Sequence, residues 1–478
     1  MIQRAIRWYD YITINIYWFA LTTRAQVLTP LILPLLVQQF VGDAAKGTYL
    51  GNIRLLALMV ALLFQSMMGL ISDRSTLPLG RRRPFIIIGT IGEIIVFVLI
   101  GFTAGMEGMT GYWFLFALYT LSMLSSNTAH AATQALIPDL VPENKRGSFS
   151  GVKALLELPV PLIFVSFVVG KMVSAGNIWG AILSVIAVMI VCAAITMFVP
   201  EKRLTKSPTP MDWKPILRLL LMTAVFTLII LGTGKLVNWV MNLSDGLQGS
   251  ASMIVTGLVG LAGMAVAIGL GVWSSVQISV GNEAKTNPSF TWWVTNRLAF
   301  LAGSTNLASF MIYFLQERFV DLQGEKAAGP ASTIIMFVGV FILLTALPSG
   351  WLSDRFGKKT IIAVAALLAA SGTAIIILIP TMPAVYIGAC FIGAGTGFFY
   401  SANWALGTEI VPKDEAGRYL GISNLAGAGA GAVGAYIGGP IGDHLGYTLL
   451  MAIYGVLFLL SIFALRNIQE PQFKVQNP

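Results

Sequence analysis

The chain has 478 residues, of which 56% are hydrophobic and only 11% charged, and its formal net charge is +9. A soluble protein carries about 25% charged residues, so this composition cannot cover a water-facing surface. It excludes a soluble enzyme, a disordered chain and a disulfide scaffold, and it predicts an all-α polytopic membrane protein. The cations lie in short loops between apolar runs, which is typical of membrane topology and not of nucleic-acid binding.

Apolar runs long enough to cross about 30 Å of hydrocarbon recur along the whole chain. The predicted helices, fourteen in all, are 11–40, 52–72, 84–104, 112–138, 148–172, 178–199, 215–236, 251–280, 290–317, 330–352, 360–379, 384–411, 418–440 and 446–465. A polar stretch at 200–214 separates the first six from the rest. An even number of spans places both termini on one side of the membrane.

The distribution of Lys and Arg indicates which side this is. If the termini are inside, the outer side receives only six of the 30 Lys and Arg residues. They are Lys46, Arg54, Lys171, Lys235, Arg318 and Lys326. Because cytoplasmic loops are enriched in cations, we expect a multi-pass protein of the cell membrane with both termini in the cytoplasm.

Two loop motifs occur twice in the chain. GLISDRSTLPLGRRRPF (69–85) corresponds to SGWLSDRFGKK (349–359), because both read Gly-x-x-Ser-Asp-Arg, a spacer, then Gly and cations. DLVPENKRGSFSG (139–151) aligns without a gap with EIVPKDEAGRYLG (409–421). The first six and the last six helices are therefore predicted to be two copies of one unit, as in transporters built from structural repeats.

The repeat predicts three parts of the chain. Residues 1–200 form an N-terminal six-helix bundle, and residues 286–478 form a C-terminal one. Residues 201–285 contain a cytoplasmic linker and two extra helices, which fall outside the repeat and look inserted.

The paired loop motifs resemble those of the major facilitator superfamily, and the resemblance covers nearly the whole chain apart from the two extra helices. The long first loop resembles that of sucrose–proton symporters and of the glycoside–pentoside–hexuronide symporters. In it, Asp73-Arg74 is followed after five residues by Gly80 and then by Arg81-Arg82-Arg83-Pro84-Phe85. Ser126-Asn127-Thr128 resembles an Asn-Asn-Thr of the sucrose symporters. The resemblance implies a major facilitator fold and proton-coupled sugar transport.

The chain departs from this branch at several positions. Gln134-Ala135 stands where the sucrose symporters have Arg-Ala, and Met123 stands where they have an Asp linked to proton coupling. Fourteen helices also occur in drug–proton antiporters and in peptide symporters. However, the helix predicted at 148–172 reads ALLELPVPLIF (154–164) and lacks the antiporters' Gly-Pro signature.

Ionisable residues inside the apolar runs are the first candidates for function, because a charge in hydrocarbon is costly. In the resembled fold, Glu157 faces the central cavity and is the best candidate for a proton carrier. Arg24 cannot lose its charge and needs a counter-charge, which Glu157 is placed to supply. His130 titrates near neutral pH and is a second proton-carrying candidate. Glu93 belongs to a peripheral helix and is expected to make a structural hydrogen bond.

A second group of candidates comes from the helix predicted at 384–411. Tyr400, Asn403 and Trp404 recur at three- and four-residue spacing, so they are expected to share a face with one another. Aromatic rings and amides suit a sugar, and Asn127 joins this set from the first copy. Ordinary helix packing explains the same pattern, and Arg297 is explained equally well by snorkelling to the inner surface.

The duplicated loop motif predicts a gate. Its residues are Asp73, Arg74, Gly80, Arg81 and Arg82 in the first copy, and Asp354, Arg355, Gly357 and Lys358 in the second. In the resembled superfamily, each Asp meets the N-terminus of a helix in the other half, here near Gly417 and Gly147. A carboxylate there contributes about 0.3–1 kcal/mol, and only while the cytoplasmic side is closed.

Together these features favour a secondary transporter that works by alternating access and imports a saccharide or glycoside with a proton. It is expected to act as a monomer, without cofactor or metal. Two alternatives stay open: an exporter of a drug-like or lipidic molecule, and a non-transporting membrane assembly factor of the same fold. An enzyme is not indicated, because the sequence has no metal-ligand cluster, no nucleophile–base pair with defined spacing and no nucleotide loop.

Overall fold

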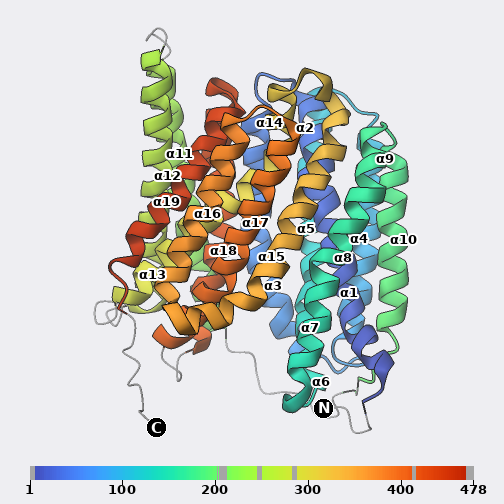
Figure 1. The fold of residues 1–478 in the computed structure, drawn as a ribbon. Helices are drawn as coiled ribbons and strands as arrows, with labels where there is room; N and C mark the ends of the chain where they lie inside the picture. The colour runs from blue at the N-terminus through green and yellow to red at the C-terminus, as the bar shows by residue number, and fades with distance from the viewer. Residues whose placement is uncertain are drawn as a thin grey trace. The chain divides into compact units, whose positions relative to one another are not determined.

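The computed structural model describes residues 6–201, 203, 213–244, 250–281, 288–411 and 416–469, and describes the side chains of all these except 244, 250–252 and 416–421. Within this part the chain is helical and contains no strand (Figure 1). The long helices before the polar stretch are α1 (Trp8–Val27) continued by α2 (Leu33–Val41), α3 (Lys46–Asp73), α4 (Arg83–Thr103), α5 (Gly108–Gln134), α7 (Arg146–Glu157) continued by α8 (Pro159–Phe164) and α9 (Gly170–Ser174), and α10 (Ile178–Thr196).

The helices after the polar stretch continue the same pattern. They are α11 (Lys214–Ser244), α12 (Ser250–Ser279), α13 (Pro288–Ser309), α14 (Met311–Arg318), α15 (Ala328–Phe356), α16 (Lys358–Leu378), α17 (Met382–Ile410), α18 (Ala416–Leu445) and α19 (Tyr447–Leu465). In the described residues, eleven helices are long and apolar enough to cross a membrane, or twelve when α13 and α14, bent by 58°, count as one span. α5 and α18 are equally long but contain more polar residues or glycines.

The predicted helices are thus present, and the largest boundary difference concerns the two extra ones. α11 continues through residues 237–244, which the sequence places in a loop, and the remaining residues 245–249 of that loop lie outside those described. The extension includes Val237, Trp239, Val240 and Met241, so the apolar pattern of the helix does not stop at 236. At 31 residues, α11 exceeds the roughly 20 residues that a bilayer requires.

Prolines interrupt two helices of the first copy. Pro30 lies in a π-helical turn, Leu28–Ile32, which links α1 to α2. Leu158, with φ −115° and ψ −78°, separates α7 from α8 directly before Pro159. Proline lacks the N–H for the helical bond and restricts the residue before it, so both breaks follow from the local sequence.

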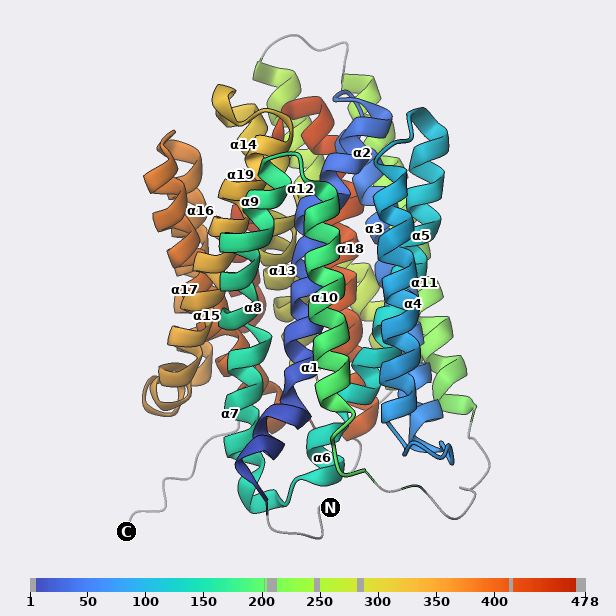
Figure 2. The same ribbon diagram turned by 90° about the vertical axis from the view of Figure 1, so that its right-hand side faces the viewer.

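Contacts divide the chain into two compact units. Unit 1 comprises residues 1–217 and 308–339, and unit 2 comprises residues 218–307 and 340–478. In unit 1, α1 packs against α7, α8 and α10, and α5 packs against α3 and α4. Figure 2 shows α7, α8 and α9 following one another along a bent path beside α1 and α10.

Residues 308–339 belong to unit 1 by contact, although the repeat assigns them to the second copy. The Tyr313 hydroxyl donates to the carbonyl of Pro34 at 2.8 Å in a buried contact. Ser166 Oγ and Thr333 Oγ1 lie 3.1 Å apart. Ser174 donates to the carbonyl of Lys326 at 3.1 Å. The contact units therefore follow helix packing, whereas the predicted domains follow the order of the repeat.

In unit 2, α16 packs against α17 and α19, and α12 packs against α18. α11 and α12 run side by side as the green pair in Figure 1. Phe226 of α11 is fully buried and contacts Gly271 of α12 and Gly429 of α18. Small residues let helices approach closely in a membrane, and here they receive the aromatic ring of α11.

Candidate functional site

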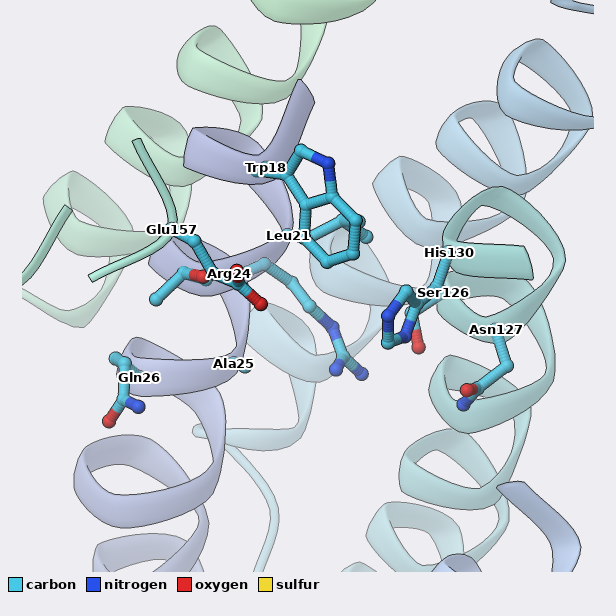
Figure 3. Close-up of a pocket in the computed structure, with 10 residues that line it drawn as sticks. Trp18, Leu21, Arg24, Ala25, Gln26, Ser126, Asn127, His130 and Glu157 are labelled. Atoms are coloured by element: carbon cyan, nitrogen blue, oxygen red, sulfur yellow. The ribbon is translucent and has the colours of Figure 1, made fainter. Parts of the chain in front are cut away.

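A cavity of about 210 Å³ lies inside unit 1. It is formed by α1, α5 and the end of α7, where helix-interior polar residues converge (Figure 3). Its lining comprises Trp18, Leu21, Thr22, Arg24, Ala25, Gln26, Ser126, Asn127, His130 and Glu157. The four candidates that the sequence singled out in the first copy, Arg24, Asn127, His130 and Glu157, are therefore brought together at one site.

Arg24 is 5% exposed and forms the centre of a buried polar cluster. Its Nε donates to Glu93 Oε1 and its Nη2 donates to Ser122 Oγ. Ser122 Oγ also donates to Glu93 Oε1 at 2.7 Å. Figure 3 shows the Arg24 side chain reaching from α1 toward Ser126 and His130 on α5.

The expected pairing of Arg24 with Glu157 is wrong. The counter-charge comes from Glu93 on α4, which is 2% exposed and lies across from Arg24 in the packed helices. Glu93 Oε2 is buried and has no hydrogen-bond partner among the described residues. The structural hydrogen bond expected for Glu93 is present, and its donor is the guanidinium of Arg24, a residue that lines the cavity.

Glu157 has a different partner, which the sequence reasoning missed. Lys153, one helical turn earlier, places its Nζ 3.5 Å from Glu157 Oε2. The same Nζ lies 3.8 Å from the centroid of the Trp18 ring. His130 meets this ring edge-on, at 5.3 Å between centroids. A carboxylate, an ammonium, an indole and an imidazole thus contact one another in sequence, and the carboxylate, the indole and the imidazole belong to residues that line the cavity.

The candidate group of the second copy lies in unit 2, but its residues do not share one face. Asn403 is fully buried, whereas Tyr400 and Trp404 are 40% and 45% exposed. Around a helix axis, the residue three positions on lies to one side of the starting residue, and the residue four positions on lies to the other. Relative to Tyr400, Asn403 is therefore rotated away from Trp404, which separates Asn403 from the two rings. Gly407 follows Asn403 into the packed side, where it contacts Trp293.

Hydrogen bonds hold Asn403 between helices. Its Nδ2 donates to Asn296 Oδ1 at 3.0 Å, and its Oδ1 accepts from Arg297 Nη1 at 3.0 Å. Its backbone carbonyl accepts from Trp293 Nε1 at 2.9 Å. The amide is thereby occupied within unit 2, so its role as a direct sugar ligand is not supported. Arg297 also turns toward α17 instead of extending as a lone side chain to the membrane surface.

The first copy of the loop motif forms an ion-pair network within unit 1. Arg82, which is 3% exposed, pairs with Asp73 and, at 2.9 Å, with Asp139, and it donates to Ser72 Oγ at 2.5 Å. Arg81 also pairs with Asp139 and lies 3.8 Å from Asp73. Basic loop residues that suffice to orient a membrane protein thus also tie the end of α3 to α6 (Leu136–Leu140), the short helix that follows α5.

The second copy forms a shorter version of this network within unit 2. Lys358 Nζ lies 2.6 Å from Glu409 Oε1 at the end of α17. Asp354 is exposed, and the guanidinium of Arg355 lies over the rings of Trp351 and Phe356. Asp139 and Glu409 occupy equivalent positions in the aligned motifs, so the repeat itself carried the signal for these two carboxylates.

The backbone conformation at the two motif glycines requires glycine. Gly80 and Gly357 have φ values of 112° and 86°, which are unfavourable for other residues. A Cβ on Gly80 would also lie 2.6 Å from Glu201 Oε2. Glu201 accepts hydrogen bonds from the backbone N–H groups of Arg82 and Arg83 at 2.6 and 3.0 Å. Its burial raises the pKa of its carboxyl above the usual value.

The sequence model of the Major Facilitator Superfamily matches residues 13–319 and 298–478. The chain belongs to the major facilitator superfamily. It is therefore a multi-pass membrane transporter of small molecules and not an enzyme.

Two relatives of the chain have sugar-related names. The minor myo-inositol transporter IolF of Bacillus subtilis (strain 168) is 24% identical over 171 residues, 34% of this chain and 37% of that protein. The D-xylose-proton symporter-like 1 of Arabidopsis thaliana is 26% identical over 162 residues, 32% of this chain and 31% of that protein. The matched segments span about a third of each relative.

Solved structures of transporters share the fold over nearly the whole chain. A POT family transporter in complex with 5-aminolevulinic acid has a TM-score of 0.64 at 12% identity and covers 94% of both chains. The nucleoside transporter NupG has a TM-score of 0.60 at 11% identity, covering 97% of this chain and 100% of that one. At these identities the likeness is one of fold.

Two gating contacts expected for this superfamily stay predictions. The contact of Asp73 with the helix near Gly417 and that of Asp354 with the helix near Gly147 each link one unit to the other. Residues 412–415 and the side chains of 416–421 lie outside those described. Within its own unit, Asp73 is already paired with Arg82.

Proposed function

We propose that this major facilitator protein imports a sugar together with a proton by alternating access. The observation that carries the proposal is the unit 1 cavity, at about 210 Å³. Pockets for drug-sized ligands measure about 300–1,000 Å³ and are mostly apolar. The smaller volume of this cavity, together with the hydroxyl, amide and charged groups among its lining residues, favours a solute of monosaccharide or small glycoside size over the drug-like or lipidic cargo of an exporter.

The side chains on the cavity wall suit a polyhydroxylated solute. Thr22, Gln26, Ser126 and Asn127 supply hydroxyl and amide groups, which both donate and accept hydrogen bonds. Asn127 uses one Nδ2 hydrogen to bond the carbonyl of Met123 at 2.8 Å, which orients the amide. The myo-inositol and D-xylose–proton transport in the names of the two relatives supports the same class of cargo.

Glu157 is the proposed proton carrier. It lines the cavity, and its side chain is 36% exposed, so a proton can reach it. Glu93 is less suitable, because its carboxylate is buried in the pair with Arg24 and balances that fixed charge. Met123, where the resembled symporters have an acid, leaves this role to another residue.

The contacts of Glu157 provide a route from the proton to the sugar. Protonation of Glu157 removes the charge that attracts Lys153, 3.5 Å away. Lys153 also contacts the face of Trp18, and His130 meets the edge of that ring. A displaced ammonium therefore changes the aromatic wall against which the sugar binds. Proton binding and sugar binding are coupled in this way through one short chain of contacts.

The remaining features of the proposal concern the whole transporter. We place it in the cell membrane as a monomer, with both termini cytoplasmic. Along the chain, the six-helix bundles comprise residues 1–200 and 286–478, and the linker with the two extra helices comprises residues 201–285. Asp73 and Asp354 close the cytoplasmic side by meeting helix N-termini of the opposite bundle. Release of these contacts opens the site to the cytoplasm and completes the transport cycle.

The test is a comparison of two transport modes in the same liposomes. A panel of sugars that includes D-xylose and myo-inositol is screened for uptake with and without an inward proton gradient. With the best substrate, Glu157→Gln should abolish gradient-driven accumulation and preserve exchange across a membrane without a gradient. Glu107→Gln, which changes an exposed acid before α5, serves as the matched control and should behave like the parent.

Two outcomes would contradict the proposal. If no sugar is taken up or exchanged by the parent, the substrate class is wrong. If Glu157→Gln accumulates sugar like the parent, Glu157 is not the proton carrier, and His130 is the next residue to replace.

A further inference from the structure

The helix that carries Glu157 is broken directly after this residue. α7 ends at Glu157, and Pro159 and Pro161 lie in the first turn of α8. Proline has no N–H, so the backbone carbonyls of Leu155 and Glu157 lack the donor that a helix supplies four residues later. Two helical hydrogen bonds are therefore missing at the bend that Figure 2 shows between α7 and α8, and the chain can bend further there.

The two sides of this break differ in burial. Among the 12 residues of α7, only Phe149 is buried. Beyond the break, two residues of α8, three of the π-helical turn Val165–Val169 and two of α9 are buried. They are Pro161, Leu162, Val165, Ser166, Val169, Gly170 and Val173. A segment with few buried contacts opens at a lower free-energy cost, so α7 is the side that can move.

Contacts with α15 fix the segment beyond the break. Leu162 packs so closely against Gly339 that a Cβ on this glycine would collide with it. Ser166 Oγ lies 3.1 Å from Thr333 Oγ1. Small residues permit such a close approach of helices inside a membrane. α8 and α9 therefore form the fixed side of the break.

Side-chain contacts with α1 hold α7 in place. The Phe149 ring stacks on Tyr11 with 4.1 Å between centroids, and Asn15 Nδ2 donates to the carbonyl of Phe149 at 3.2 Å. Both contacts lie near the start of α7. Closer to its end, Lys153 Nζ lies 3.8 Å from the centroid of the Trp18 ring. Of these contacts, the one made by Lys153 is the nearest to the break.

The charge of Glu157 controls the position of Lys153. The charged or titratable side chains that face Glu157 are Lys153 on its own helix, Arg24 on α1 and His130 on α5. Arg24 is already paired with Glu93. Glu157 Oε2 lies 3.5 Å from Lys153 Nζ, so the carboxylate attracts the ammonium only while it is ionised.

We infer that α7 is a hinged arm that pivots at Leu158 and is released when Glu157 binds a proton. The inference rests on the proposed function, in which Glu157 carries the proton, and adds the movement that follows. Protonation ends the attraction for Lys153, which leaves Trp18, and only the contacts of Phe149 then hold the arm against α1. The arm swings away from α1 and opens the unit 1 cavity toward the side of the membrane on which α7 begins. Loss of the proton restores the ion pair and closes the arm, so Lys153 acts as a positioning residue.

The test measures distances between pairs of spin labels in the purified full-length protein, with Cys192 and Cys390 replaced by alanine. The first pair is Ser148→Cys, on the exposed side of α7, and Phe198→Cys, 76% exposed after the end of α10. Ser148 lies ten residues before Leu158. This is about 15 Å along the helix, so a further bend of about 20° moves the label by about 5 Å.

Glu157→Gln imitates the protonated acid, because its amide carries no charge. It should add a population in which the distance of the first pair differs by about 5 Å from that in the parent. Lys153→Met should add the same population, because it removes the other partner of the ion pair. Glu107→Gln and Lys171→Met, which change exposed side chains away from the arm, are the matched controls and should leave the distances unchanged.

A second pair of labels tests the position of the hinge. Phe167→Cys and Leu183→Cys, both 57% exposed, lie beyond the break and on α10. Their distance should not change in Glu157→Gln. Equal shifts of both pairs would show that the helix moves as a whole, which would overturn the hinge.

Replacement of the prolines tests the cause of the flexibility. Pro159→Ala/Pro161→Ala supplies both missing N–H groups and should suppress the new population in Glu157→Gln. It should slow sugar exchange about tenfold to a hundredfold, as expected for two added hydrogen bonds, while stabilisation of the protein by bound sugar remains. Pro383→Ala is the control, because Pro383 lies in the first turn of α17, where a helix needs no N–H.

Two outcomes separate the inference from the proposed function. If Glu157→Gln abolishes gradient-driven accumulation without any shift of the first pair, the hinged arm is wrong and the proton carrier stands. If the first pair shifts as expected but Glu157→Gln accumulates sugar like the parent, the arm is supported and the proton-carrying role of Glu157 is wrong.

Discussion

The buried pair of Arg24 and Glu93 allows a quantitative prediction. Arg24 is 5% exposed and Glu93 is 2% exposed, so solvent does little to screen either charge. Removing one partner of such a pair leaves the other charge buried and costs about 3–5 kcal/mol. Arg24→Leu and Glu93→Leu should each lower the free energy of unfolding by about this amount.

The double variant should be more stable than either single variant. Replacing a buried ion pair by apolar residues is often neutral or stabilising, because the desolvation of both charges is removed together. Arg24→Leu/Glu93→Leu should therefore cost less than either single change. Ser122 loses both partners in the double variant, so we expect a residual cost of about 1 kcal/mol. The coupling free energy is then several kcal/mol.

The assay is thermal unfolding of the purified protein in detergent, followed by the fluorescence of its 11 tryptophans. Lys153→Leu and Glu157→Leu, alone and together, provide the matched cycle. Their side chains are 27% and 36% exposed, so water screens this pair and its coupling should stay below about 1 kcal/mol. If the Arg24 and Glu93 changes are additive, the pair is not the electrostatic unit that the geometry indicates.

Two further predictions concern packing and pH. Gly89→Ala should destabilise the protein by about 1–3 kcal/mol, because the new Cβ would lie 2.6 Å from the backbone oxygen of Ser125. Gly269→Ala is the control, since Gly269 has open space around it, and it should be neutral or stabilise the protein by up to about 1 kcal/mol. Equal melting temperatures of the two variants would contradict the close contact of α4 and α5. The hydrogen bond from Lys46, followed by that from Gln38, lowers the pKa of Asp43 below its usual value of 3.8. The stabilisation by Asp43 is therefore present above pH 3.8 and is lost as the pH falls through the lowered pKa. The difference in melting temperature between the parent and Asp43→Asn should stay constant near neutral pH and shrink in acid, and a difference that does not change with pH would refute the assignment.

The cavity shows how far residue-by-residue reasoning can lead. Ionisable groups in apolar runs need a partner or a function, which points to Arg24, His130 and Glu157, and the resemblance to the sucrose symporters adds Asn127; all four line one cavity. The identity of their partners was not predictable in the same way. Lys153 was missed although it lies one turn from Glu157, because a lysine near the inner end of a helix resembles an ordinary topology signal.

In the second copy, the residue spacing likewise did not predict which side chains are buried. Tyr400, Asn403 and Trp404 have a spacing that predicts one shared face, yet Asn403 is buried by neighbouring helices and the two rings are exposed. Spacing gives the angle between side chains around a helix axis. The rotation of that helix against its neighbours decides which angles face the interior, and many distant contacts set this rotation.

The membrane environment, the helices, the repeated loop motifs and the superfamily all follow from the amino-acid sequence alone. These properties depend on local hydropathy, on proline positions and on short motifs, which act over a few residues at a time. The packing of the helices, in contrast, sets the pairing of Arg24 with Glu93, the uncharged partners of Arg297 and the position of residues 308–339 within unit 1. The physical reason is that a buried charge interacts with whichever group the packed helices bring within a few ångströms, and that group can be about 70 positions away in the chain, as Glu93 is from Arg24.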